Sequence, residues 1–201
     1  MVKQALKTSG YSANTSKYYL LNAGAIFKNV EYNATSGKYE GDPIGATTEG
    51  AKLNIAISLR QPEVDGVLTK VKGNDVIENI EATLECTLKE WKKENIANAL
   101  FADVTAGNGT TTPTGYKIIK GRNEILDSDY ITNIAYVGKI SGENEPVIIF
   151  LKNALNTAGL SIETADKGEA GIPCKFEARA DADKPEDYNS IWEIVYPETT
   201  P

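Results

Sequence analysis

The 201-residue chain contains no histidine, only two cysteines and a single methionine. Without histidine the chain cannot form a Ser-His-Asp triad, a Cys-His pair or an imidazole site for a metal ion. It also lacks a Gly-x-x-x-x-Gly-Lys-Ser/Thr phosphate-binding loop and a Gly-x-Gly-x-x-Gly motif between a strand and a helix. We therefore expect no catalytic residues, no metal site and no cofactor, and a protein that is not an enzyme. An acidic pair for glycoside hydrolysis could still be drawn from the 28 acidic residues, but nothing marks one pair over the others.

Long apolar runs are absent as well. No run reaches 18 residues, so no segment is predicted to span a bilayer. The first residues, Met1–Lys7, lack the apolar core of a secretory signal, so we expect synthesis in a cytoplasm. The length suits a single domain with extensions. We expect an N-terminal arm at 1–18, a β-domain at 19–196 and a C-terminal tail at 197–201.

The net charge of −7 excludes a conventional DNA-binding domain, because affinity for nucleic acid comes mostly from Lys and Arg side chains that neutralise phosphates. A negative surface suits a protein past which DNA must slide without sticking. Cys86 and Cys174 both fall at apolar positions of predicted strands. We expect both to be buried structural cysteines, since two cysteines do not make a disulfide framework.

The most informative stretch is a pair of long strands predicted at 51–60 and 80–88. In the first, Leu53, Ile55, Ile57 and Leu59 alternate with mostly polar residues, and in the second Ile80, Ala82, Leu84, Cys86 and Leu88 alternate with Glu and Thr. Successive strand side chains point to opposite faces, so each strand has one dry face and one wet face. Such sheets favour antiparallel pairing. The connection at 61–75 is far longer than a hairpin turn, and its apolar residues suit docking better than disorder.

One helix is predicted, at 89–101, where Trp91, Ile96 and Leu100 fall on one face at helical spacing. We expect these three residues to pack the helix on a sheet, because three turns are not stable alone. Further strands are predicted at 19–30, 116–120, 130–140, 147–151, 160–164, 172–180 and 191–196, and 31–43 is predicted to be a turn or loop. The pattern indicates a mainly β fold: two packed antiparallel sheets, as a β-sandwich or barrel, with one flanking α-helix and a long hairpin loop.

Two stretches, IGATTEGAKLNIAISLRQPEVDGVLTKVKG and IENIEATLECTLKEWKKENIANAL, resemble the major tail proteins (tail tube proteins) of bacteriophages with long non-contractile tails. A third, DYITNIAYVGKISGENEPVIIFLKNALNTAGLSIETADKGEAGIPCKFEARAD, matches the same family. The resemblance covers roughly residues 45–181 and rests on order and pattern rather than on a short signature.

The resemblance implies a structural virion protein whose six copies form a ring, each adding four strands to a shared barrel. Stacked rings make the tail tube, the conduit that delivers double-stranded DNA to the host without sequence-specific binding. The long hairpin loop then contacts the next ring, and its expected stacking residues are Pro62, Val64, Val67, Leu68 and Val71. The expected lumen-lining residues are Ser58, Glu81, Thr83 and Glu85. Implied partners are further copies of the chain and the tape-measure, tail-tip and tail-terminator proteins, with assembly in the bacterial cytoplasm.

Other interpretations remain open. The inner tube of a contractile injection device has the same fold, and co-assembly with a sheath would distinguish it. A β-sandwich binding module, such as a virion decoration protein or an adhesin domain, would be a stable monomer or trimer with a ligand. In that case the polar strand face simply contacts bulk water, and the long loop has no clear role.

Overall fold

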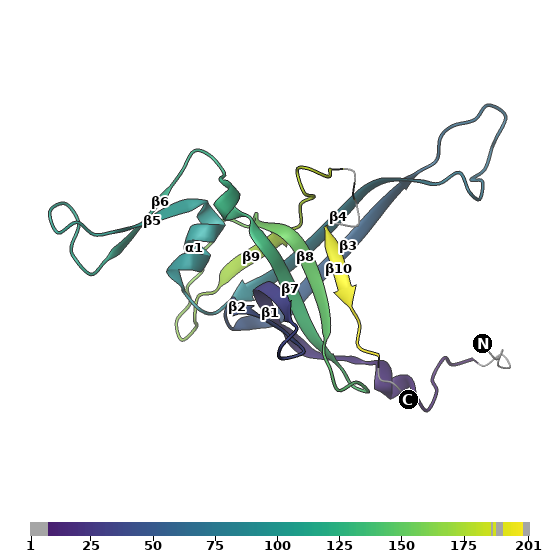
Figure 1. Ribbon diagram of the computed structural model, residues 1–201, viewed down its shortest axis with the longest axis horizontal. Helices are drawn as coiled ribbons and strands as arrows, with labels where there is room; N and C mark the ends of the chain where they lie inside the picture. Colours follow the sequence, from purple (N-terminus) through teal and green to yellow (C-terminus); the bar gives the residue numbers. More distant parts are fainter. Residues whose placement is uncertain (1–7, 186, 188–190, 199–201) are drawn as a thin grey trace.

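The computed structural model describes residues 8–185, 187 and 191–198, and it consists mainly of β-strands (Figure 1). Residues 1–7 of the predicted arm and 199–201 of the predicted tail lie outside the described residues. The prediction of a mainly β fold with one α-helix and a long hairpin loop is confirmed for the described part of the chain. The strands are β1 (Leu20–Asn33), β2 (Lys38–Pro43), β3 (Thr47–Arg60), β4 (Val76–Leu88), β5 (Ala102–Ala106), β6 (Lys117–Gly121), β7 (Ile131–Ile140), β8 (Val147–Asn156), β9 (Ile172–Glu177) and β10 (Trp192–Val195). The helices are η1 (Thr15–Tyr18), α1 (Lys93–Leu100) and η2 (Asp127–Asp129).

The large sheet divides at β8. Its strands follow the order β2-β1-β7-β8-β9-β4-β3, with every neighbouring pair antiparallel. One edge of β8 pairs with β7 along its length. The other edge pairs first with β10 and then, at Leu155 and Asn156, with β9. The sheet therefore continues from β8 in two directions, and β5 and β6 form a separate small sheet.

The two halves of the large sheet pack on one hydrophobic core. Leu84 and Leu88 of β4 and Ile172 of β9 meet Ile134 of β7 and Leu151 of β8 there, all fully or almost fully buried. The two predicted layers are thus halves of one bent sheet that is not closed into a barrel among the described residues. The apolar run at 147–151 is buried on both faces, because Ile148 and Phe150 pack in a second cluster with Val30 and Ala135.

The helix is shorter than the predicted 89–101. Its first expected turn is instead bonded to Ala46, the residue just before β3: the Lys89 N–H donates to the Ala46 carbonyl at 2.8 Å, and the Glu90 carboxylate accepts from the Ala46 N–H at 2.8 Å. α1 ends where Phe101 adopts a left-handed φ of 48° and its N–H bonds to the Ala97 carbonyl. This is a common way for a helix to stop.

Three other predictions are corrected. The predicted loop at 31–43 contains the end of β1 and all of β2, and β5 has no counterpart among the predicted strands. Residues 160–164 alternate in hydrophobicity but form no strand, since this segment has no pairing partner among the described residues. Leu160 packs against the core, whereas Ile162 is exposed.

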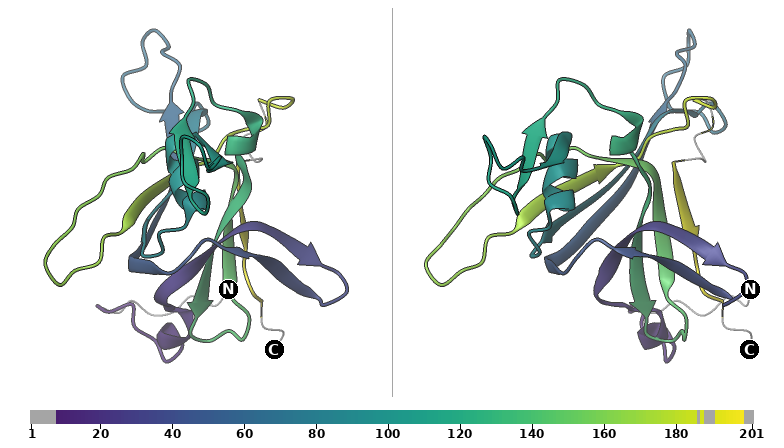
Figure 2. Two further views of the ribbon diagram at one scale, coloured as in Figure 1. Left: turned by 90° about the vertical axis from the view of Figure 1, so that its left-hand side faces the viewer. Right: turned by 60° about the vertical axis from the view of Figure 1, so that its left-hand side comes forward.

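Two hairpins project from the body of the molecule. The β3–β4 hairpin and its loop extend to one side, and the β5–β6 hairpin extends to the other (Figures 1 and 2). The β3–β4 hairpin carries most of the candidate site.

Candidate functional site

The β3–β4 hairpin combines a core-forming base with an exposed tip. At the base, Ala82, Leu84 and Cys86 are buried, and Leu53 and Ile55 of β3 pack against the same core. Beyond the core the two strands stay paired through a shift in register between Ser58 and Leu59, and the apolar residues there are exposed: Ile57, Leu59, Val76 and Ile77. We call residues 57–80 the arm, which is distinct from the N-terminal segment predicted at 1–18. Its strands form by cross-strand pairing rather than by burial against the rest of the molecule.

The loop of the arm spans residues 61–75, as predicted, and is held by its own polar groups. The Gln61 side-chain amide donates to the Asp75 carboxylate at 2.7 Å and accepts from the Val71 N–H at 3.3 Å. The Asn74 amide donates to the Pro62 carbonyl at 3.1 Å. These bonds close the neck of the loop and leave its apolar side chains outside. The five residues predicted to stack rings are all exposed: Pro62, Val64, Val67, Leu68 and Val71. Leu68 is 96% exposed.

The second part of the site is a polar face on the outer side of β3, β4 and β9. Cross-strand register places Lys52 opposite Glu85 and Glu85 opposite Lys175. One step along, Asn54 lies opposite Thr83 and Thr83 opposite Glu177. We call the following set the polar face: Lys52, Asn54, Ser58, Glu81, Thr83, Glu85, Lys175, Glu177 and Arg179. All four predicted lining residues, Ser58, Glu81, Thr83 and Glu85, lie on it.

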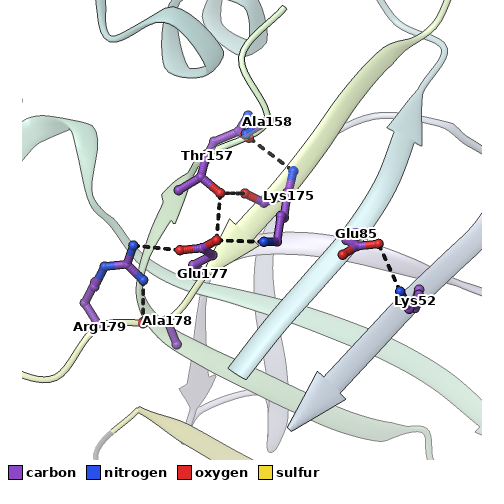
Figure 3. A network of polar contacts seen from close by, with 9 residues as sticks. Lys52, Glu85, Thr157, Ala158, Lys175, Glu177, Ala178 and Arg179 are labelled. Carbon is purple, nitrogen blue, oxygen red and sulfur yellow. Dashed lines mark hydrogen bonds and ion pairs between the residues drawn. The ribbon is translucent and has the colours of Figure 1, made fainter. Parts of the chain in front are cut away.

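Ion pairs connect the charges of the polar face (Figure 3). Lys52 Nζ lies 3.4 Å from Glu85 Oε2. Lys175 Nζ lies 2.9 Å from Glu177 Oε1, and Arg179 lies 2.8 Å from the other oxygen of the same carboxylate. The Thr157 hydroxyl also donates to Glu177 at 3.0 Å. Lys175 and Arg179 hold the pKa of Glu177 at about 2, and Glu177 in turn raises the pKa of Lys175.

The charge balance of the polar face differs from the predicted acidic lining. Its carboxylates are Glu81, Glu85 and Glu177, and its cations are Lys52, Lys175 and Arg179. The formal charges cancel. The sequence did not predict Lys175 and Glu177 of β9, or Arg179 just after it, as part of this face, because only the sheet register reveals that β9 lies beside β4.

The helix contacts differ from those predicted. Ile96 packs against the core, and Ala97 and Ala99 are the buried residues of α1. Leu100 is 41% exposed at the end of the helix, and Trp91 precedes the helix and is 42% exposed. Because the helix begins two residues after Trp91, this side chain packs beside the 157–171 loop instead, where its indole N–H donates to the Ala170 carbonyl at 2.7 Å.

Within the described residues, no group of three or more His, Cys, Asp or Glu side chains is placed to hold a metal ion. None of the helices in the same part of the chain is long and apolar enough to cross a membrane. No protein-family model matches the chain, and a search of curated proteins found no match.

Proposed function

We propose that this chain is a structural subunit of a bacteriophage tail tube, which polymerises as stacked hexameric rings and forms the conduit for DNA. The observation that carries the proposal is the arm, whose apolar residues extend past the core of the subunit. Monomeric proteins rarely leave so many large apolar side chains of one segment uncovered. A second copy of the chain is the natural cover for it.

The energetics of the arm favour contact between copies. Its exposed apolar residues are Ile57, Leu59, Val64, Val67, Leu68, Val71, Val76 and Ile77. Full burial of a side chain of this size stabilises a complex by about 1.5–3 kcal/mol. The outer edge of β3 is also a 14-residue edge strand of the sheet. An unpaired edge of that length invites pairing with another chain, and closure of a ring removes it.

The polar face suits the wall of a channel for DNA. Cations bind DNA by neutralising its phosphates. Here Lys52, Lys175 and Arg179 are already paired with carboxylates of the same face. We propose that the lining resists adhesion through paired charges and hydroxyl groups rather than through a net negative charge. In this role the chain would meet tape-measure, tail-tip and tail-terminator proteins, be assembled in the bacterial cytoplasm and reside in the virion tail.

The test is electron microscopy and sedimentation velocity of the purified protein over a concentration series. We expect rings or hollow tubes for the wild type and none for the double variant Val67→Asp/Leu68→Asp. The control is Ile162→Asp, which places one such charge at an exposed apolar residue of the 157–171 loop. Assembly of the arm variant at wild-type level would contradict the role of the arm. Co-assembly with a contractile sheath protein would assign the tube to a contractile device.

A second candidate is a binding module such as a virion decoration protein or an adhesin domain. A groove of about 480 Å³ between the β1–β2 hairpin and β10 favours it, lined in part by Phe27, Val30, Tyr39, Ile148 and Val195. A wild type that stays monomeric at every concentration would favour this candidate over the tube.

A further inference from the structure

The two cysteines of the chain face each other across the sheet. Cys86 of β4 and Cys174 of β9 are directly opposed in the antiparallel register, and both are buried free thiols. Sequence position gave no sign of this arrangement, because the two strands are far apart along the chain. Their juxtaposition creates a dithiol where composition alone indicates two inert residues.

The backbone geometry brings the two residues within reach of a covalent bond. The Ala178 N–H donates to the Ala82 carbonyl at 2.9 Å, so every second pair from there, including Cys86 and Cys174, is a hydrogen-bonded pair. The Cα atoms of such pairs lie about 5.5 Å apart. Disulfides span Cα separations of roughly 4.4–6.8 Å. Opposed Cβ atoms of a hydrogen-bonded pair lie about 5.5 Å apart against roughly 3.5–4.5 Å in a disulfide, so an approach of about 1–2 Å closes the bond.

The surroundings of Cys174 supply both a hydrogen bond and access. Its thiol donates to the Ile172 carbonyl at 3.8 Å, and the buried side chain of Asn156, 1% exposed, acts on its pKa. Contact with Cys174 and burial raise the pKa of the Cys86 thiol, whereas contact with Cys86 and Asn156 lowers the pKa of Cys174. A polar pocket of about 350 Å³ beneath α1 reaches Cys174. Its lining includes Glu94 and Ser128, which are exposed, so the pocket opens to the surface.

We propose that Cys86 and Cys174 form a redox-active pair that closes to an intramolecular disulfide and joins β4 to β9. With diamide as oxidant, the Cys174 thiolate adds to the N=N bond. The Cys86 sulfur then attacks the Cys174 sulfur and releases the hydrazine. The two thiols lose two protons and two electrons, and the azo compound gains them. Only the biological setting rests on the proposed function: a virion subunit made in a reducing cytoplasm meets oxidising conditions after release.

The test treats the folded wild type with diamide, unfolds it in the presence of N-ethylmaleimide, and measures intact mass and proteolytic peptides. We expect no alkylated cysteine, a mass lower by two hydrogen atoms, and a peptide that links Cys86 to Cys174. Dithiothreitol should restore two alkylation sites. Cys86→Ala and Cys174→Ala are the matched controls, and neither can form the link.

The proposal is overturned if both thiols of the folded wild type remain open to alkylation after diamide, or if the links found join different molecules. Circular dichroism during oxidation establishes that the protein stays folded. Thiol oxidation of the monomer is independent of assembly, so failure of this proposal is distinguishable from failure to form tubes.

Discussion

Glu177 is the residue on which the polar face depends most, because two cations and a hydroxyl converge on its carboxylate. Its pKa of about 2 lies below the ordinary value of 4.5. A lowered pKa stabilises the fold above the unfolded-state pKa, and this stabilisation is lost as pH falls through the folded-state value. The loss therefore falls between about pH 4.5 and pH 2.

We predict that Glu177→Gln is less stable than the wild type at pH 7 and that the difference disappears toward pH 2. The shift corresponds to at most about 3 kcal/mol, and less in practice because solvent screens partly exposed ion pairs. Urea unfolding at pH 7, 4 and 2.5 measures the difference. Glu163→Gln, on the exposed 157–171 loop, is the control and should follow the wild type at each pH. A constant difference across this range would refute the assignment.

At the residue scale, the sequence predicts which face of a strand a side chain occupies better than it predicts the groups to which that side chain bonds. The alternation of β4 correctly identified Ala82, Leu84, Cys86 and Leu88 as core residues, since facing follows from a period of two. The amides of Gln61 and Asn74 escaped prediction, because their bonds exist only once the loop has closed.

At the scale of elements, the β5–β6 hairpin is anchored by one largely buried ion pair. Arg122, just after β6, pairs with Asp129 of η2 and donates to the Phe101 carbonyl at 3.2 Å. Asp129 also accepts from the Leu126 N–H at 2.8 Å. Removal of one partner from a buried pair leaves an uncompensated charge, which is strongly destabilising.

We predict that Asp129→Asn lowers the free energy of unfolding by about 3 kcal/mol. Asp103→Asn is the matched control, since Asp103 lies 3.5 Å from the same guanidinium but is mostly exposed. Its loss should cost less than about 1 kcal/mol. Urea unfolding of both variants provides the comparison, and equal losses would show that the buried contact does not anchor the hairpin.

Elements were predictable where the apolar pattern was long. β3, β4 and β7 were predicted with one end correct and the other within four residues, because each has a long alternation or apolar run. β8 was predicted from the correct first residue, but it continues to Asn156, five residues beyond the predicted end at 151. β2 has a single strongly apolar position, Tyr39, beside glycine and proline, so its strand exists only through pairing with β1. The failed prediction at 160–164 is the converse: a suitable pattern without a partner strand.

At the scale of the whole molecule, the division of the sheet at β8 was not predictable. It depends on β9 and β10, the two strands that follow β8 in the chain, both pairing with the same edge of β8. That arrangement places β9 beside β4 and so completes the polar face with Lys175 and Glu177. The candidate lining is thus a product of topology, although six of its nine residues come from the hairpin that the sequence indicated.

The proposed resistance of the polar face to DNA should depend on the pairing of its charges. Glu81→Lys/Glu85→Lys removes two carboxylates and leaves Lys52 without its partner. We expect this variant to bind duplex DNA, with the slope of log K against log salt steeper by about 2 or more. Fluorescence anisotropy with a short duplex, on monomers and on assembled tubes, measures binding over a salt series.

The control, Glu124→Lys/Glu163→Lys, makes the same change in net charge at exposed residues outside the polar face. If net charge alone governed binding, the two variants would bind alike. Stronger binding by the polar-face variant, in tubes as well as in monomers, would place the face where DNA can reach it after assembly. Binding by that variant as a monomer but not as a tube would instead bury the face between subunits and contradict its role as the lining.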